Sequence, residues 1–465
     1  MKSILKVGLI SLLLVGLLAA CGTGGGTPQE AAPADTPAEA AAPAVEPAAA
    51  AEDLEYEGLT GVLTYWSCFS GDSMIWDQWR IDEFMAEFPG ITVDAQFVPE
   101  SAGINNGVLM AAIAGGTAPD LIIADDFVAA FGFAAQGAFE PWDPFLEAID
   151  MRIDEFMPGF HGLMQFRGQT YLLPQDSNVI MMYLNVELVE AAGLDLNDYP
   201  TNIEELNAWA EAMMVVNEDG SFQQMGMVPW MDTPSAPFFW PFMFGAELYY
   251  PDEGRIDITT QPVVDALQWQ RAFAQQYDIT QIESFAQAVG GLFSPNHPFY
   301  TGRLGIMIVG NWATNALRIY APDVEYVVRP VPVPPGGRVE STTLGSNVFA
   351  MPVNPDNPLL AATFVRFSQR AEINGVNFDQ WRSIPTIDAI FDDVSWTIAG
   401  DEIYAMQRRL ANSPLSGHPG LSPVAGQMQV GMEQLRDQVL FDDVDPLPLL
   451  EVLQENLQAA LDAMN

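Results

Sequence analysis

The chain has very few basic side chains, and its two lysines, Lys2 and Lys6, both stand at the N-terminus. The chain has 17 lysines and arginines in all, and every one except these two lysines is an arginine. A Walker-type phosphate loop, a Schiff-base lysine and a Ser–Lys dyad are therefore excluded. The formal net charge of −44 at pH 7 argues against nucleic acid and anionic lipid headgroups as partners, because both are negatively charged. Such an acidic composition has two explanations, a cationic ligand or a salty or acidic habitat.

Histidine is also scarce, and the common catalytic motifs are absent. The three histidines are His161, His297 and His418, and no two of them have the spacing of metal ligands. No G-x-S-x-G turn occurs. We therefore expect neither a metal nor a cofactor. A pair of carboxylates that hydrolyses glycosidic bonds stays open, because the sequence does not give the distance between acidic side chains.

Only two cysteines are present, Cys21 and Cys68. Cys21 follows Ala19 and Ala20, which end a stretch with a basic start and an apolar run over 7–18. These features are typical of a secretory signal, and the run is too short to span a bilayer comfortably. We predict a signal peptide at 1–20 and a mature protein outside the cytoplasmic membrane. Cys68 then has no second cysteine for an intrachain disulfide, so a hydrophobic core has to supply the stability.

The position of Cys21 resembles the lipobox of bacterial lipoproteins. In that family the signal is removed, the cysteine becomes the first residue, and its sulfur carries a lipid. The resemblance implies that Cys21 is the lipidation site and that the protein is anchored to a membrane. The alternative is a soluble secreted protein with a cysteine at this place by chance.

Residues 21–58 are an Ala/Pro/Glu-rich segment with no aromatic residue before Tyr56. Such a segment cannot bury enough apolar surface to offset the entropy of ordering, so we predict a disordered tether. An unstructured leader without a lipid is the alternative. The rest of the chain, roughly 400 residues, is long enough for a large globular unit with two lobes.

Strand and helix patterns alternate from residue 59 onward. Residues 62–66, 91–98 and 121–124 have the β-branched and apolar composition of strands, and helical patterns lie between them. This alternation indicates parallel α/β layers. In such sheets a ligand lies beyond the carboxyl ends of the strands, where Trp66 and Asp126 stand.

Two later segments have clear local signals. Thr201 and Glu204 have capping-box spacing and open a predicted helix with Leu206 and Trp209 on one side. Residues 304–309 are typical of a buried strand, and Gly310 lets the chain turn directly before Trp312.

Several short motifs occur in a fixed order along the chain. They are Phe88-Pro89-Gly90-Ile91 with Val93, Ala112 to Asp120, Met182-Tyr183-Leu184-Asn185, Tyr199 to Leu206, Phe299 to Arg303, Met307 to Trp312, the Pro-rich Pro330 to Pro335 and the turn Gly345-Ser346-Asn347. In this order and spacing the chain resembles the carbohydrate-type (family 1) extracellular solute-binding proteins of bacterial ABC importers. The match runs from about residue 59 to 370 and departs slightly from the commoner family choices at Ile203 and at residues 310–312.

The resemblance implies a two-lobed, periplasmic-binding-protein-like α/β fold of type II with a ligand cleft between the lobes. We place lobe 1 at 59–176 plus 330–383 and lobe 2 at 177–329 plus 384–465. The predicted hinge crossings are 174–178, 327–332 and 382–385.

The same resemblance implies a receptor, and not an enzyme, that delivers a sugar or oligosaccharide to ABC transporter permease subunits by hinge closure. We expect a monomer that reaches the membrane through its N-terminal lipid. One alternative keeps the fold and binds a cationic solute such as a polyamine, which the acidic balance favours. A secreted glycosidase is the other alternative.

A sugar site needs aromatic side chains for the apolar ring faces and short polar side chains for the hydroxyls. The candidate aromatic residues are Trp66, Trp230, Trp240, Trp312 and Trp381. Trp66 and Trp312 stand at strand ends and match family positions that often line the cleft. Core packing explains Trp230 and Trp240 equally well.

The candidate polar residues are Asp72, Asp126, Asp176, Asn347 and Arg382. Asp126 follows a buried strand and Asp176 lies beside a predicted crossing. Each of these side chains has an ordinary alternative role, since Asp72 fits a helix cap and Arg382 fits an ion pair with a neighbouring acid.

Overall fold

The computed structural model describes residues 58–69, 72–98, 107–125, 127–233, 236–392 and 401–464. The predicted signal peptide, Cys21 and all of the predicted tether except Gly58 lie outside these residues, as does Asp126. The backbones of Asp72 and Trp381 are described, but their side chains are not.

The first sheet has the strand order β2-β1-β3-β16-β4, and β7 also pairs with β16. Its strands are β1 (Gly61–Ser67), β2 (Ile91–Phe97), β3 (Leu121–Ala124), β4 (Phe139–Glu140), β7 (Leu173–Pro174) and β16 (Val348–Pro352). β1 is parallel to β2 and β3, as the alternating pattern predicts, whereas β16 is antiparallel to β3, β4 and β7. The carboxyl ends of β1 and β3 therefore lie at one edge of the sheet.

The second sheet is built around β8 and is antiparallel throughout its described pairs. Its strands are β8 (Asn178–Asn185), β13 (Ile306–Gly310), β14 (Tyr326–Arg329) and β15 (Leu344–Gly345). Gly310 lies opposite Ile180, and Gly345 lies opposite Asn178. The ends of β13 and β15 thus meet the beginning of β8.

Six short strands form three antiparallel hairpins. They are β5 (Gln165–Phe166) with β6 (Gln169–Thr170), β9 (Val215–Val216) with β10 (Phe222–Gln224), and β11 (Tyr249–Tyr250) with β12 (Arg255–Ile256).

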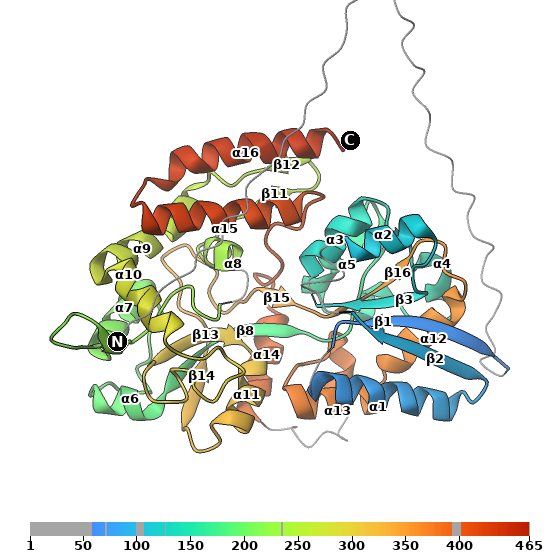
Figure 1. The fold of residues 1–465 in the computed structure, drawn as a ribbon, viewed down its shortest axis with the longest axis horizontal. Coiled ribbons are helices and arrows are strands. Elements are labelled where there is room, and N and C mark those ends of the chain that lie inside the picture. The colour runs from blue at the N-terminus through green and yellow to red at the C-terminus, as the bar shows by residue number, and fades with distance from the viewer. Residues whose placement is uncertain are drawn as a thin grey trace, which may run out of the picture. The chain divides into compact units, whose positions relative to one another are not determined.

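Helices cover both sheets, as Figure 1 shows. In the first part of the chain these are α1 (Asp72–Glu87), α2 (Val108–Gly115), α3 (Phe127–Ala135), α4 (Asp143–Leu146), α5 (His161–Met164), α6 (Val186–Ala191), α7 (Ile203–Ala212) and α8 (Ala236–Met243). They continue with α9 (Gln261–Tyr277), α10 (Ile279–Gln287), α11 (Trp312–Tyr320), α12 (Pro358–Ser368), α13 (Ala371–Trp381), α14 (Glu402–Ala411), α15 (Ala425–Phe441) and α16 (Pro446–Asp462). In Figure 1, α1 and α12 lie on one face of the first sheet and α3 lies on the other.

The chain passes between the two sheets at positions that agree in part with the predicted crossings. The crossing at 174–178 is confirmed, because Pro174 ends β7 in the first sheet and Asn178 begins β8 in the second. The crossing at 327–332 is wrong, because Tyr326–Arg329 is a strand of the second sheet. The return comes later, between Gly345 and Val348. The limits of the two lobes stay a prediction.

The apolar core is continuous beneath both sheets and includes most of β8. A second cluster lies among α8, α9, α15 and α16, with Phe238, Leu267, Met428 and Leu457 buried in it. Full burial of such a side chain contributes about 1.5 to 3 kcal/mol. Within the described part of the chain, no helix is both long and apolar enough to cross a bilayer.

Candidate functional site

Three stretches of chain are hydrogen-bonded side by side where the backbone changes sheet. The Gln175 N–H donates to the Asn347 carbonyl oxygen at 2.7 Å. Ser177 and Ile384 exchange two backbone hydrogen bonds, of 2.7 and 3.3 Å. The segment 175–177 therefore lies between residue 347 on one side and the predicted crossing at 382–385 on the other. This arrangement suits a hinge, because a few residues there can absorb a rotation of two packed bodies.

Asp176 is the charged centre of this hinge and is only 4% exposed. Its carboxylate accepts from the Asn347 N–H at 3.0 Å and from Asn347 Nδ2 at 3.1 Å to each oxygen. Burial raises the pKa of Asp176 to about 6, although hydrogen bonds from Asn347 and Ser383 act in the opposite direction, and nearby Asp125 raises it further. The structure thus brings two predicted ligand-binding residues together, where they bind each other.

Asn311 joins the second sheet to the third crossing. Its Oδ1 accepts from the Val179 N–H at 2.8 Å, and its Nδ2 donates to the Arg382 carbonyl at 3.2 Å and to Ser383 Oγ at 3.4 Å. Asn311 is completely buried, so each of these hydrogen bonds satisfies a group that water does not reach. Sequence reasoning treated Asn311 only as part of a motif and missed this role.

Trp312 begins α11 directly after this asparagine and is half-buried. Its indole lies over the backbone of Gly310, where a Cβ atom would come within 2.0 Å of the ring. Glycine is therefore needed at the end of β13 so that the indole can take this position. Gly310 has no positive φ, so the need for glycine at this turn is steric and not conformational.

Trp66 is also half-buried and lies near the carboxyl end of β1. The next residue, Ser67, donates from Oγ to Asp77 at 2.5 Å, and Asp77 is paired with the completely buried Arg80. Arg80 Nη1 in turn donates to Gln175 Oε1 at 2.9 Å. A buried polar network thus connects the strand end beside Trp66 to the first hinge crossing.

Trp230 and Trp240 have different environments. Trp240 is completely buried, donates from Nε1 to the Pro229 carbonyl at 2.6 Å, and packs its ring 4.6 Å from Trp269. These contacts make Trp240 a core residue, so we remove it from the candidate aromatic residues of the sugar site. Trp230 is half-buried, and its Nε1 donates to Glu283 at 3.1 Å.

Arg382 ends α13 in a left-handed conformation, with φ of 57°. Its guanidinium lies 3.9 Å from Asp401 and 5.7 Å from the ring centre of Tyr404. Arg382 therefore forms an ion pair with an acidic residue, which is the alternative role that the sequence suggested for it. Asp72 is the first residue of α1, and Trp381 is the last residue of α13, directly before the predicted crossing at 382–385.

A model of the family of bacterial extracellular solute-binding proteins matches residues 74–374, which is more than half of the chain. The chain belongs to this family. The predicted membership is thereby confirmed.

Relatives of this solute-binding protein include a binding protein of Brucella abortus, 28% identical over 258 residues, which are 55% of this chain and 59% of that protein. The chain therefore spans less than two thirds of that relative. The arabinooligosaccharide-binding protein of Halalkalibacterium halodurans is 24% identical over 327 residues, 68% of this chain and 69% of that protein. The relatives named here are binding proteins.

Two solved structures have the same fold. CpMnBP1 with mannotriose bound has a TM-score of 0.76 and 24% identity, over 85% of this chain and 99% of that chain. The GacH receptor of Streptomyces glaucescens, solved unliganded and in complex with acarbose, has a TM-score of 0.71 and 18% identity, over 87% and 99%. The predicted two-lobed α/β fold of the solute-binding proteins is confirmed.

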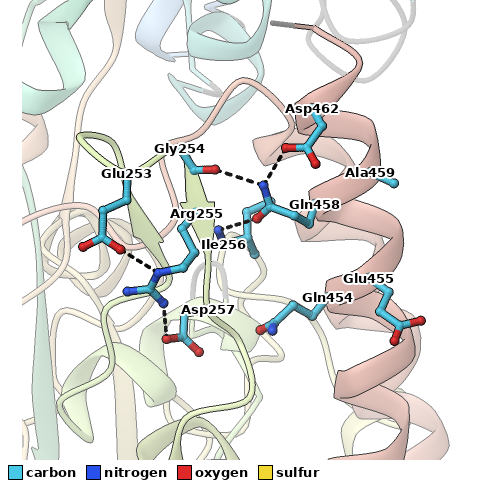
Figure 2. A pocket seen from close by; sticks show the side chains of 10 residues that line it. All are labelled: Glu253, Gly254, Arg255, Ile256, Asp257, Gln454, Glu455, Gln458, Ala459 and Asp462. Carbon is cyan, nitrogen blue, oxygen red and sulfur yellow. Dashed lines mark hydrogen bonds and ion pairs between the residues drawn. The ribbon is translucent and has the colours of Figure 1, made fainter.

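The solute-binding protein also has a surface pocket of about 780 Å³ between β12 and α16 (Figure 2), and none of the predicted site residues lines it. Arg255 lies there between Glu253 and Asp257, while Gln458 accepts from the Ile256 N–H at 3.0 Å. No aromatic side chain lines it, and its polar groups largely bind one another. The pocket therefore lacks the stacking surface that a sugar ring requires.

Proposed function

We propose that this protein is a lipid-anchored extracytoplasmic receptor that binds a sugar or oligosaccharide and delivers it to the permease of an ABC transporter. One observation carries the proposal: half-buried Trp66 and Trp312 stand at strand ends on either side of a hinge made of hydrogen-bonded crossings. The family and the fold support the receptor role. The sugar class is supported by one relative named for arabino-oligosaccharides and by neighbours with mannotriose or acarbose bound.

The chemistry of the proposed site follows from these side chains. An indole face packs against the C–H face of a pyranose or furanose ring, and carboxylate and amide oxygens accept from its hydroxyls. In our proposal Trp66, Trp312, Trp230 and Trp381 supply the aromatic surfaces. Asp72, Asp126 and Arg382 supply polar contacts, whereas Asp176 and Asn347 hold the hinge beneath them.

Binding of the solute and closure of the two lobes are thermodynamically linked. A solute that touches both lobes binds the closed arrangement more tightly than the open one, and it can shift the equilibrium only by that difference in affinity. The closed form then presents a surface made by both lobes, which the permease can distinguish from the open form. A monomer is sufficient for this mechanism.

The test of the ligand class is calorimetric titration of the mature protein with mannobiose, mannotriose, arabino-oligosaccharides, maltotriose and acarbose. We expect saturable binding of at least one of them. Spermidine and putrescine belong in the same panel because the net charge of −44 favours cations. Salt-sensitive polyamine binding with no saccharide binding would replace the sugar by a cationic solute. Release of reducing ends during the titrations would instead indicate a glycosidase.

The lipid anchor has a separate test. Cys21→Ser removes the sulfur that the lipid needs, so we expect the variant to leave the membrane fraction and the wild-type chain to stay there. Cys68→Ser is the matched control, because residue 68 lies in the folded part near β1. Equal release of the wild-type protein and the Cys21 variant would rule out the anchor and leave the receptor role intact.

A further inference from the structure

Arg80 of α1 is a completely buried cation that contacts both β1 and the first hinge crossing. Its Nη2 donates to Tyr65 Oη at 2.9 Å and is paired with Asp77, and its Nη1 donates to Gln175 Oε1 at 2.9 Å. The guanidinium lies 4.5 Å from the ring centre of Trp76, and its Nε has no hydrogen-bond partner within the described part of the chain. Burial of such a charge is costly, and apolar side chains of similar volume often stabilise a fold equally well. Stability alone therefore does not explain this ion pair.

The Asp77 end of the pair fixes the end of β1. Ser67, the last residue of β1, donates from Oγ to Asp77 Oδ2 at 2.5 Å, and both side chains are buried. Trp66 directly precedes Ser67, and its half-buried indole is one of the aromatic surfaces that we propose for the solute. The ion pair therefore holds the backbone beside a proposed binding residue.

The Gln175 end of the pair fixes the hinge. Gln175 Nε2 donates to Asn374 Oδ1 in α13, and Asn374 Nδ2 donates to Gln369 Oε1 at 3.2 Å. Gln369 Nε2 donates to the Pro174 carbonyl at 2.6 Å, and the same carbonyl accepts from Thr386 Oγ1 at 3.1 Å. All of these side chains are buried, so water does not compete for their bonds. The network thus holds the first crossing at 174–175 and reaches the end of the third crossing.

We propose that Arg80 is a positioning residue for solute binding, which acts through Asp77 and Gln175. It keeps the indole of Trp66 and the first hinge crossing in one rigid frame. The proposal rests on the proposed function. Asp176 follows Gln175 directly, so closure at this point moves Trp66 along a defined path. Without the network the crossing is less ordered in the free protein, and binding then includes the entropic cost of ordering it.

The test measures Kd by calorimetry with whichever ligand of the panel binds. Asp77→Asn/Arg80→Met removes both charges, keeps an amide partner for Ser67 and nearly preserves the side-chain volumes. We expect this variant to fold and its Kd to rise about fivefold. Gln175→Met breaks the same link from the hinge side and should raise Kd by a similar factor. Because both changes interrupt one path, the combined variant should bind no more weakly than the weaker of the two.

Glu87→Gln/Arg370→Met is the matched control. Arg370 donates to both carboxylate oxygens of Glu87, at 2.7 and 2.8 Å, so this ion pair also joins α1 to the start of α13. Its two side chains are 37% and 43% exposed, and exposed ion pairs contribute little. We therefore expect the Kd of the control to stay within about twofold of the wild-type value.

The outcomes are distinguishable. If the wild-type protein binds no ligand of the panel, the proposed function fails and takes this inference with it. If the wild-type protein binds and Asp77→Asn/Arg80→Met binds equally well, only the positioning role is overturned. Factors that multiply in the combined variant, or a rise in Kd that the control reproduces, would overturn it too. Should Asp77→Asn/Arg80→Met not fold, Gln175→Met decides, because it changes no charge, and an unchanged Kd would refute the proposal.

Discussion

Asp176 and Asn347 bind each other across the first and second crossings of the hinge. The carboxylate accepts from both the backbone and the side chain of Asn347, and it is almost completely buried. Oxygens that are satisfied in this way are poorly available to a solute. The pair therefore joins the two crossings, and in our proposal the ligand contacts fall to side chains that are more exposed.

The buried carboxyl of Asp176 predicts a pH dependence of stability. Its pKa is about 6 in the folded protein against 3.8 ordinarily, so the folded state binds the proton more tightly. The stability that this proton gives is fully present below pH 3.8 and is lost as the pH rises through 6. Relative to Asp176→Asn, the free energy of unfolding of the wild-type protein should rise on the order of 3 kcal/mol between pH 7 and 4. Urea denaturation at several pH values measures this difference, and a constant difference would contradict it.

Removal of the Asn311 side chain should loosen the hinge. Asn311→Ala leaves the Val179 N–H and the Arg382 carbonyl without these partners, and buried unsatisfied groups cost about 1 to 3 kcal/mol each. We expect a loss of about 2 to 4 kcal/mol in the free energy of unfolding. Asn197→Ala is the control, since Asn197 bonds Asp195 in an exposed turn and should change stability by less than about 0.5 kcal/mol. Equal effects of the two substitutions would refute the role of Asn311.

Gly310→Ala should displace the indole of Trp312. The new Cβ would lie 2.0 Å from the ring, so the ring has to move, and both stability and saccharide affinity should fall. Overpacking of this kind costs about 1 to 3 kcal/mol. Gly426→Ala, in α15 with nothing within 4 Å of the new atom, is the control and should be neutral or slightly stabilising. An unchanged Kd in Gly310→Ala would show that the position of Trp312 does not matter for binding.

We propose that the half-buried tryptophans bind the solute and that the completely buried Trp240 belongs to the core. Trp66→Ala and Trp312→Ala should each weaken saccharide binding about tenfold or more, since buried aromatic contacts of this kind contribute about 2 kcal/mol. Trp240→Phe loses its bond to Pro229 and should lower the melting temperature without changing Kd by more than about twofold. The opposite pattern, with Kd sensitive only to Trp240, would reverse the assignment.

Elements with strong local patterns could be predicted from the sequence. The predicted strands at 62–66 and 121–124 are β1 and β3, with bounds that differ little. The capping box shifted by one residue: Asn202 Oδ1, and not Thr201, accepts from the helix, at the Glu205 N–H, while Glu205 accepts from Thr201. Asparagine and threonine are both good N-caps, so sequence spacing could not separate them.

The site was harder to predict, because its geometry depends on contacts between residues far apart in sequence. The Asp176–Asn347 pair and the three bonds of Asn311 join segments that only the fold brings together. The second crossing, predicted at 327–332, was misplaced because Val327 and its neighbours have no local signal that separates a strand of the second sheet from a connection.

Small-angle X-ray scattering of the mature protein with and without a saccharide that binds tests the hinge most directly. The account predicts that saturation with the saccharide lowers the radius of gyration, because the two lobes close on the solute. A radius that does not change when calorimetry shows the site to be full would contradict it.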